Sequence, residues 1–558
     1  MKSHWVLNPN AQAKPGFAGA PDIHPVVARI LFERGYQTLK AAQKFLNPSL
    51  NNLESPFAFA DMEKAVERIR RAIAGKEKIM IYGDYDVDGI TGSSILFPVL
   101  RKLGADVEVY IPHRIEEGYG LNPEALAKLL KKKFSLFITV DNGITGVEQI
   151  EFLKSNGADV IIVDHHTPKE KLPPADAIVS ACAGERKGDP NLAACGLAFK
   201  LAWALTGDLN EVKDYLDLVA LGTIADIAPV TGDNRILLKQ GLPILIQAKR
   251  AGIRALIESS RLSKSSISFR DIAFVFGPRI NASGRMGSPE TAFKLLTTDN
   301  SMLARNLAAI LEEGNKDRQR VESQTLEEAL EIIEQGLFAA EDRVIVVNNE
   351  DWHEGVLGIV AARIVERYQK PSIVLSVKNG VGKGSGRSLP KFSLFDCVLS
   401  CEELLMSFGG HAQACGLSIK KENIPIFRKR LNETAIQMAP ESKAPELEID
   451  AEISLSDVGE ALIQDLEKLA PFGPGNKKPL FLTRDLRVKG VPKKRGKDTL
   501  QCWVTDRFGQ TTCEGVGFRM YERWEKLRQT NGLSLVYHPT LSKFNGIRSL
   551  QLELEDWC

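Results

Sequence analysis

Short apolar runs rich in β-branched residues alternate with amphipathic stretches between residues 77 and 164. The runs read EKIMIY, DVEVYI, FSLFITV and ADVIIVD, and polar segments with a helical pattern separate them. Alternation of this kind is typical of a mainly parallel sheet that helices cover on both faces. The pattern therefore predicts an α/β domain in the first half of the chain.

The pattern changes several times after this domain. Residues 194–260 have the period of helices, and residues 301–336 form a long, highly charged helical stretch that we expect to be solvated and to bridge two domains. RVIVVNN and PSIVLSV then flank a helical segment near residues 355–367, which predicts a second α/β unit. From about residue 446, short alternating strands with Gly turns predict a small β-barrel of the OB type.

These changes divide the chain into five expected segments. ESKAPE, at residues 441–446, has the composition of a linker before the last of them. The segments are an N-terminal helical region (1–75), an α/β domain (76–300), a helical connector (301–336), a second α/β domain (337–440) and an OB-like domain (446–558). The predicted fold class is therefore α/β with a C-terminal β-barrel.

Composition places the chain among globular proteins. It has 558 residues, of which 44% are hydrophobic and 26% charged, and this length predicts several domains. The sequence has neither a signal-like N-terminal segment nor an apolar run of membrane-spanning length, so we expect a cytoplasmic protein with no membrane partner. The eight scattered cysteines fit reduced thiols. The net charge is +1, so any nucleic-acid site must be a local basic patch.

Acidic and histidine residues directly follow three of the predicted strands. They are Asp84, Asp86 and Asp88 in GDYDVDG, Asp141 in VDNGI, and His165 and His166 in VDHH. Because the carboxyl ends of parallel strands lie along one edge of a sheet, we expect these residues to converge there. The three aspartates of GDYDVDG alternate, so an extended segment would turn them to one face. Asp226 in GTIADIAPV is a fourth candidate, since a lone carboxylate among apolar residues is costly to bury.

Clustered carboxylates repel one another, and divalent cations remove that repulsion. Oxygen ligands with one or two imidazoles suit Mn²⁺ or Mg²⁺, and the number of ligands exceeds the need of one ion. We therefore expect two ions that activate water at a phosphoester.

Two other interpretations of these aspartates are weaker. DYDVDG is similar to the start of an EF-hand loop, but Ile95 stands where that loop needs Glu, and a predicted strand precedes it where a helix belongs. Isolated aspartates after strands are also common helix N-caps, which would suffice for Asp141 alone. Three clusters after three strands favour the metal site over either alternative.

The motifs YGDYDVDGITGSS, VDNGI, VDHH and GTIADIAPV occur in this order, and together they resemble the DHH phosphoesterase superfamily. RINASGRMGSP (279–289) resembles a further motif of its RecJ branch. GKGSGRS (382–388) and GGHAQACGLSI (409–419) resemble the DHH-associated C-terminal domain. The likeness covers nearly the whole chain from about residue 50. It implies that segment 76–300 is a parallel-sheet DHH catalytic domain and that segment 337–440 is the DHH-associated domain.

Matched position by position, the resemblance implies roles for the clustered residues. Asp84 would be an acidic catalytic position beside the metals, and His166 would face the scissile phosphate. Some relatives have a metal-binding His where this chain has Tyr82, which indicates that ligation of one metal differs from theirs. The implied metal ligands are Asp86, Asp88, Asp141, His165 and Asp226.

Polar residues in and around the Gly-rich motifs are candidates for substrate binding. Gly-rich segments let backbone N–H groups approach an anion, and neighbouring Ser, Arg and His side chains add contacts to phosphates. The alternatives are ordinary turns for the Gly-rich segments and a self-stabilised loop for RINASGR. The candidates are Arg114, Arg279, Asn281, Ser283, Arg285, Ser385, Arg387, Gly409, Gly410 and His411.

The last domain has a basic loop between two predicted strands, which we expect to contact DNA. The residues of this loop are Lys493, Lys494, Arg495 and Lys497. Aromatic residues of the same domain are suited to stacking on bases, although we expect most of them to be core. These aromatic residues are Trp503, Phe508, Phe518, Tyr537 and Phe544.

The resemblance implies an exonuclease that degrades single-stranded DNA from its 5′ end to mononucleotides, in DNA repair and recombination. It also implies a single-stranded-DNA-binding protein and a helicase as partners. Two alternatives stay open. A phosphoesterase of short RNA or cyclic dinucleotides would share the metal site, but the OB-like tail disfavours it. A non-catalytic DNA-binding scaffold of the same fold is disfavoured by the full ligand set.

Overall fold

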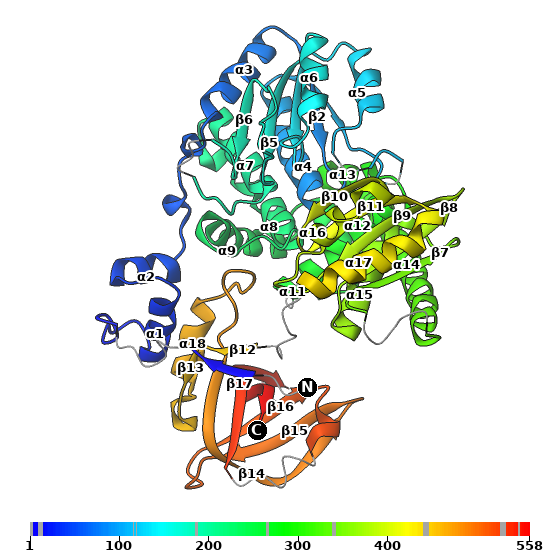
Figure 1. Cartoon of the computed structure of the whole chain (residues 1–558). Coiled ribbons are helices and arrows are strands. Elements are labelled where there is room, and N and C mark those ends of the chain that lie inside the picture. The colour runs from blue at the N-terminus through cyan, green and yellow to red at the C-terminus, as the bar shows by residue number, and fades with distance from the viewer. Residues whose placement is uncertain are drawn as a thin grey trace. The chain divides into compact units, whose positions relative to one another are not determined.

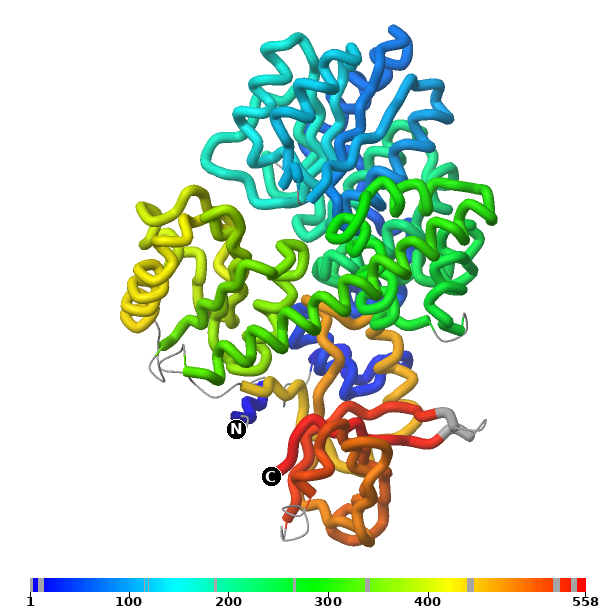
Figure 2. Tube along the Cα trace, turned by 90° about the vertical axis from the view of Figure 1, so that its right-hand side faces the viewer, coloured from blue at the N-terminus to red at the C-terminus, as the bar shows by residue number. Residues whose placement is uncertain are grey.

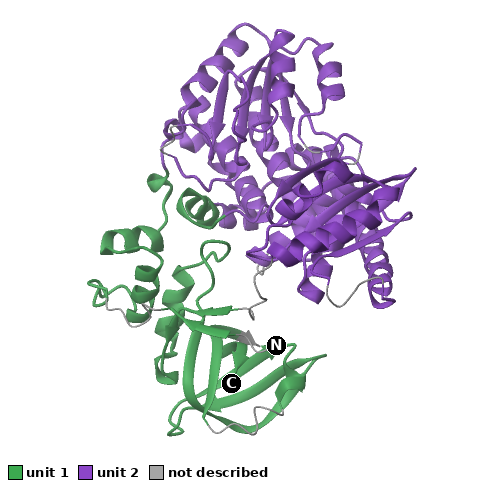
Figure 3. Cartoon of the chain, in the orientation of Figure 1, with its two compact units in different colours: residues 1–53, 229–240, 443–558 green, residues 54–228, 241–442 purple. Residues whose placement is uncertain are grey.

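The computed structural model divides the chain into two compact units (Figure 3). Unit 1 comprises residues 1–53, 229–240 and 443–558, and unit 2 comprises residues 54–228 and 241–442. The structure describes residues 4–8, 15–114, 116–118, 120–184, 188–263, 267–336, 342–438, 446–524, 532–544 and 547–558.

The first sheet of unit 2 has five parallel strands in the order β3-β2-β4-β5-β6 (Figure 1). Its strands are β2 (Lys78–Gly83), β3 (Asp106–Tyr110), β4 (Leu136–Val140), β5 (Asp159–Asp164) and β6 (Ala177–Ser180). Helices pack on both faces, so strand residues of both faces are buried, which gives the continuous apolar runs of the sequence. These helices are α3 (Met62–Ala74), α4 (Val87–Lys102), α5 (Pro123–Leu130), α6 (Val147–Ser155) and α7 (Ala194–Thr206). The predicted parallel α/β domain is confirmed.

Helices follow this sheet, as the period of the sequence predicts. The longest is α14 (Ser301–Glu334), a helix of 34 residues that forms the long green rod in Figure 2. Between Asp271 and Gly277 the chain makes a π-helical turn, η6 (Ile272–Phe276). The other helices are α8 (Leu216–Ala225), α9 (Gly232–Gln247), α10 (Ala251–Ser259), α11 (Phe269–Asp271), α12 (Gly277–Met286) and α13 (Glu290–Thr297).

The second sheet of unit 2 is mixed and has the strand order β10-β11-β9-β8-β7. Its strands are β7 (Ile345–Asn349), β8 (Ser372–Lys378), β9 (Val381–Arg387), β10 (Leu405–His411) and β11 (Ala414–Lys420). Helix α15 (Leu357–Tyr368) and the end of α14 pack on one face, and α16 (Leu394–Leu399) and α17 (Ile424–Met438) pack on the other. The second α/β unit is confirmed, with antiparallel strands added to one parallel pair.

The first Gly-rich segment of this domain lies in a strand, so its interpretation as a turn was wrong, whereas GGHAQACG spans the hairpin between β10 and β11, with Ala412 and Gln413 in the turn. GKGSGR belongs to β9, and GGH ends β10. A Cβ on Gly384 would lie 2.9 Å from the Leu375 side chain, and one on Gly386 would lie 2.7 Å from Sγ of Cys415. These glycines therefore allow close packing inside the sheet.

Unit 1 contains a closed five-stranded β-barrel. The strands follow the order β14-β15-β16-β18-β17, and β14 also pairs with β17. They are β14 (Phe481–Arg495), β15 (Thr499–Thr505), β16 (Thr512–Phe518), β17 (Leu533–Phe544) and β18 (Ile547–Trp557). The OB-like barrel predicted from the sequence is confirmed. Residues 441–445 of the predicted linker lie outside the described residues.

The N-terminal region shares its core with this barrel. Val27 and Ile30 of α1 (Pro25–Glu33) belong to the same buried cluster as Leu462 of α18 (Glu460–Lys468) and Phe481. Short helices such as α1 and α2 (Leu39–Leu46) cannot bury an apolar face alone, so they need such a partner. The region also forms a strand that the sequence did not predict, since β1 (His4–Leu7) pairs with β12 (Glu446–Ile449).

Two findings bear on the environment of the chain. No helix among the described residues combines the length and the apolarity needed to cross a membrane. All eight cysteines are free thiols.

Glu33 gives unit 1 a testable pH dependence. Burial, and then the charge of Asp450, raise the pKa of Glu33 to about 7, and both carboxylate oxygens are buried without a hydrogen-bond partner among the described residues. The protonated acid is therefore favoured in the folded state. The stability that the protonated Glu33 contributes is fully present below the unfolded-state pKa of about 4.5, and it is lost as pH rises through the folded-state pKa of about 7. Glu33→Gln should raise the thermal midpoint at pH 8 but not at pH 4, as measured by calorimetry. An equal shift at both pH values would contradict the assignment.

Candidate active site

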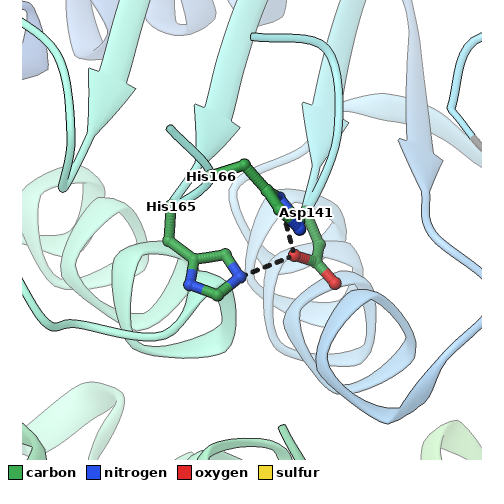
Figure 4. Close-up of side chains that lie close together, drawn as sticks. All are labelled: Asp141, His165 and His166. Atoms are coloured by element: carbon green, nitrogen blue, oxygen red, sulfur yellow. Dashed lines mark ion pairs between the residues drawn. The ribbon is translucent and has the colours of Figure 1, made fainter. Parts of the chain in front are cut away.

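Three side chains from two neighbouring strand ends meet at the carboxyl edge of the first sheet (Figure 4). Asp141 directly follows β4, and His165 and His166 directly follow β5, which pairs with β4. Nε2 of His165 lies 3.2 Å from Oδ1 of Asp141, and Nδ1 of His166 lies 3.7 Å from the same oxygen. The convergence that a parallel sheet predicts is present in the structure.

The GDYDVDG motif follows β2, the other neighbour of β4, but it is not extended. The N–H of Asp84 donates to the carbonyl of Val140, which continues the strand by one residue. Oδ1 of Asp86 then accepts from the N–H groups of Asp88 and Gly89, at 2.9 and 3.2 Å, and caps helix α4. The expectation of one extended face was wrong, because this cap starts the helix and places Asp88 in its first turn.

Asp88 is held by the start of a second helix. Its Oδ2 accepts from the N–H of Ala194 and its Oδ1 from the N–H of Cys195, both at 2.8 Å. These residues begin α7, where N–H groups lack partners within their own helix. The positive end of the helix therefore orients the Asp88 carboxylate.

Asp226 joins the cluster from the C-terminal end of α8. Its Oδ2 lies 3.9 Å from Nε2 of His165. Carboxylate oxygens and imidazole nitrogens are the donors that suit Mn²⁺ or Mg²⁺. Three groups offer ligand atoms within 4.8 Å of one another: Asp84, Asp86 and Asp141; Asp88, His165 and Asp226; and Asp141, His165 and His166.

Burial and repulsion raise the pKa of three carboxyl groups in this cluster. Burial, followed by the charge of Asp86, raises the pKa of Asp84 well above its usual range. Burial, followed by neighbouring aspartates, does the same for Asp141. Burial, followed by the charges of Asp88 and Asp86, raises the pKa of Asp226 to about 9. Oδ1 of Asp84 is buried and has no hydrogen-bond partner among the described residues. These residues fit divalent cations, whose charge would replace the protons.

Asp164 belongs to the VDHH cluster that follows the strand, but the sequence assigned it no role. It is buried at the end of β5, and its Oδ1 lies 2.8 Å from Nδ1 of His166. Its Oδ2 accepts from the N–H of Ile144 at 3.0 Å. Burial lowers the pKa of His166, but the hydrogen bond to Asp164 and the charges of Asp164, Asp86 and Asp226 together outweigh burial and raise it to about 9. Asp164 therefore favours the protonated form of His166 and fixes the direction of its ring. Its place before the histidine pair in VDHH was the available signal.

Tyr82 takes no part in the carboxylate cluster. Its side chain is fully buried in the core of the first sheet. The hydroxyl accepts from the N–H of Asn122 at 3.2 Å and donates to the carbonyl of Gly120. The position that carries a histidine in some DHH relatives is a core position here.

The RINASGR segment is helix α12, so the alternative of a self-stabilised loop was wrong. Nε of Arg279 donates to Glu312 of α14 at 2.7 Å, and Oγ of Ser283 donates to the carbonyl of Ile280. These two contacts engage Arg279 and Ser283 within the protein. Asn281 has a different position, because its Oδ1 accepts from the N–H of Val87 and ties α12 to the start of α4.

Three arginines gather beside the carboxylate cluster. Arg114 lies over the ring of Tyr85 at 4.8 Å, and Nη1 of Arg387 donates to Oγ of Ser385 at 3.1 Å. Burial, followed by the charge of Arg114, lowers the pKa of Arg285 to about 9 and also lowers that of Arg387. Like charges gathered in this way are suited to an anion such as a phosphate.

His411 and Gly409 pair with Ala414 and Gly416 of β11, which pair in turn with Arg387 and Ser385 of β9. Gly410 lies between them. Gly409, Gly410 and His411 end β10, which is the edge strand of the second sheet, and all three are exposed. Within the described residues, no hydrogen bond or ion pair joins them to the carboxylate cluster. Their role in substrate binding stays a prediction.

In unit 1, the basic segment extends a strand instead of forming a loop. Lys493, Lys494 and Arg495 end β14 and pair with residues 499–501 of β15, while Lys497 lies in the turn. Long hairpins keep such residues in register, so their side chains alternate between the two faces of the ribbon.

The aromatic residues of the barrel are mostly exposed. Trp503 is 49% exposed, Phe508 76% and Phe518 60%. The expectation that most of them are core was therefore wrong for these three and right for the fully buried Tyr537. In β15, Trp503 alternates with inward-facing neighbours and so points away from the barrel interior. The Phe544 side chain lies outside the described residues.

Three family models match the chain. The DHH family, N-terminal domain, matches residues 78–223, the DHHA1 domain matches residues 341–437, and the RecJ OB domain matches residues 449–556. The single-stranded-DNA-specific exonuclease RecJ of Bacillus subtilis is 38% identical over 100% of this chain and 71% of its own length. The exonuclease of the same name from Dickeya dadantii is 33% identical over 96% of both chains.

Solved structures agree with these matches. The crystal structure of RecJ in complex with Mn²⁺ from Thermus thermophilus has a TM-score of 0.84 at 29% identity, covering 100% of this chain and 79% of that one. The Mg²⁺ complex from the same organism has a TM-score of 0.77 at 27% identity, covering 99% and 78%. Sequence, fold and the acidic site thus lead to one conclusion: the chain belongs to the RecJ family of single-stranded-DNA-specific exonucleases.

Proposed function

We propose that the protein is a metal-dependent exonuclease that hydrolyses single-stranded DNA from the 5′ end to mononucleotides, in DNA repair and recombination. The observation that carries the proposal is the cluster of carboxylates and imidazoles at the edge of the first sheet. The names of the relatives support the substrate. The direction of digestion rests on the family likeness, since no residue contact on the described surface distinguishes the two ends of a strand.

The cluster would hold two Mn²⁺ or Mg²⁺ ions. Asp86, Asp88, Asp141, His165 and Asp226 are the proposed ligands, and their donor atoms suit these ions. When bound, the ions would lower the pKa of a water molecule and neutralise charge on the phosphate oxygens.

The residues around the ligands have separate tasks in this proposal. Asp88 and Asp86 are fixed by helix starts, so the ligand geometry is set before substrate arrives. Asp84 would keep a buried negative charge beside the ions, in a position to orient water. His166, whose protonated form Asp164 favours, would donate a hydrogen bond to an oxygen of the scissile phosphate.

The three arginines would hold the phosphates of the strand. Arg285 and Arg387 are partly buried next to Arg114, and an anion would relieve their mutual repulsion. Ser385 would add a neutral hydrogen bond from the same strand, β9. Bound in this way, the strand would present a phosphodiester to the metal cluster.

The barrel would add affinity for long strands. Trp503 lies opposite Lys489 in the β14–β15 pairing, and Lys493 and Arg495 lie further along the same strand. An exposed aromatic among basic side chains suits base stacking beside a phosphate backbone. This surface favours long single strands over short RNA or cyclic dinucleotides, because a long strand offers bases for stacking in addition to the phosphodiester that is hydrolysed. A scaffold without catalysis would gain nothing from buried carboxylates that repel one another.

The cellular setting follows from the family. We infer a cytoplasmic location, and a single-stranded-DNA-binding protein and a helicase as partners that would supply the single strand. Neither partner has a docking surface that the described contacts define.

Asp141 and His166 should separate metal binding from catalysis. Asp141→Asn should reduce hydrolysis by about a thousandfold and remove bound Mn²⁺, because a ligand shared by the cluster is lost. It should also raise the thermal midpoint of the metal-free protein, since one repelling charge is gone. His166→Asn should reduce the rate while Mn²⁺ content, measured by elemental analysis, stays normal. Equal loss of metal in both variants would contradict the role of His166.

Strand choice and direction test the function itself. A single-stranded oligonucleotide with a blocked 3′ end should be degraded in Mn²⁺, while one with a blocked 5′ end and a blunt duplex should persist, as followed by gel electrophoresis of internally labelled strands. Affinity should fall as salt rises, because phosphate contacts release counterions. RNA of the same sequence serves as the control for strand chemistry. Rapid loss of the 5′-blocked strand would refute the direction.

Trp503 tests the role of the barrel. Trp503→Ala should weaken binding of a long single-stranded oligonucleotide by about tenfold, since stacking on one base contributes about 1–3 kcal/mol, and should spare a five-nucleotide strand. Phe57→Ala is the matched control, because Phe57 is 50% exposed and lies in unit 2. Point substitution is preferred to truncation, which would expose the core shared with α1. Unchanged affinity in fluorescence anisotropy would exclude this surface.

A further inference from the structure

Helix α8 ends in a turn where glycine is the usual residue. The N–H of Ala228 donates to the carbonyl of Thr223, and the N–H of Ile227 donates to that of Ile224, both at 3.2 Å. These two bonds define the Schellman motif, in which the residue after the C-cap has a left-handed backbone. Ile227 occupies this position with a φ of 62°, a conformation that strains a β-branched side chain.

Other helices of the chain fill the same position differently. Gly35 and Gly104 occupy it after α1 and α4, and Lys76 and Arg261 occupy it after α3 and α10. Among the described non-glycine residues with positive φ, Ile227 alone is β-branched. The fold therefore accepts glycine or a flexible polar residue at such ends, and α8 departs from that pattern.

Packing does not offset the strain at Ile227. Its side chain is 67% exposed, although it is a large apolar group. Strained residues that no local packing requires are concentrated at functional sites. Here the strained residue directly follows Asp226, whose Oδ2 lies 3.9 Å from Nε2 of His165.

A second exposed apolar residue lies on a neighbouring element. Phe274 is 73% exposed in the π-helical turn η6, which packs against α8. The start of α12, directly after this turn, comes close to the same helix end, since a Cβ on Gly277 would lie 3.4 Å from Cβ of Ala225. Single π-helical turns are frequent at functional sites.

We propose that Ile227 is a substrate-contacting residue that packs against the nucleobase of the terminal nucleotide, whose phosphate the metal cluster holds. This inference rests on the proposed exonuclease function. A phosphodiester brought to Asp226 carries its base within reach of the next residue along the chain. The charged cluster contacts only the phosphate, so an apolar side chain beside it is the group suited to the face of the base. Phe274 would border the same base from η6.

The test compares side-chain loss with strain relief. Ile227→Ala removes the side chain and keeps the unfavourable backbone, Ile227→Val retains most of the contact, and Ile227→Gly removes both contact and strain. Lys76→Gly is the matched control, because it relieves the same strained position after α3. Each variant is assayed in Mn²⁺ on a single-stranded oligonucleotide with an intact terminal nucleotide and on one whose terminal nucleotide is abasic.

The expected results differ between the two substrates. Ile227→Ala and Ile227→Gly should lose about tenfold in kcat/KM on the intact end, while on the abasic end they should match the wild-type enzyme, which itself loses about tenfold there. Ile227→Val should remain close to wild type. Ile227→Gly and Lys76→Gly should both raise the thermal midpoint by about 2 °C, and Lys76→Gly should keep full activity on both substrates. Mn²⁺ content should be normal in all four variants.

Other outcomes overturn the inference. Full activity of Ile227→Ala on the intact end would show that the side chain has no contact with the base. An equal loss on intact and abasic ends would show an indirect effect on the metal cluster. Failure of the wild-type enzyme to shorten any single strand would instead refute the proposed function, so the two failures are distinguishable.

Discussion

Repulsion among buried carboxylates is the constraint on which this site depends. Asp84, Asp86, Asp88, Asp141 and Asp226 are gathered at one end of one sheet, and burial together with their mutual charge raises the pKa of several of them. Removing charges from water is costly unless they are paired. The fold therefore holds these carboxylates in an arrangement that is unfavourable without cations and that bound cations stabilise.

The surrounding elements counter this repulsion without removing it. N–H groups at the start of α4 donate hydrogen bonds to the Asp86 carboxylate, and N–H groups at the start of α7 donate to that of Asp88. The positive ends of these helices thus stabilise both negative charges. Parallel strands supply the other half of the arrangement, because β2, β4 and β5 are neighbours and end at the same edge. Glycine at position 89 allows the helix to approach Asp84, since a Cβ there would lie 2.5 Å from the Asp84 backbone nitrogen. The same backbone elements thus place the carboxylates and supply the N–H groups that stabilise their charge.

A similar relation holds for the positive groups. Arg285 and Arg387 are partly buried with lowered pKa values, so they too are in an unfavourable state without a counter-charge. The carboxylates repel one another in the free protein, and so do the arginines. A substrate whose phosphate lies between the metal ions and the arginines would relieve the repulsion in both groups. Strain at Ile227 adds a third unfavourable feature, since its backbone is held in a left-handed conformation directly after Asp226, a proposed metal ligand.

The sequence by itself determined the architecture and the chemistry of the site. Period and strand-end position predicted the parallel sheet, the barrel and the convergence of Asp141, His165 and His166, because alternation and sheet topology are local or combinatorial rules. The family motifs added the ligand set. The sheet, the barrel and the ligand set could be predicted because each depends on the order of residues within individual strands, helices and motifs.

Only the tertiary structure decided how individual side chains are used. Asp86 became a helix cap, Asp164 became the partner of His166, and Arg279 was engaged by Glu312, although none of these contacts follows from residue spacing. The exposure of Trp503 likewise depended on which face of β15 meets the barrel core. The Asp86 and Asp164 contacts are local, whereas the engagement of Arg279 and the exposure of Trp503 depend on residues distant in sequence, whose packing fixes burial and charge. Burial and charge, in turn, set which carboxylates repel and which side chains remain for a ligand.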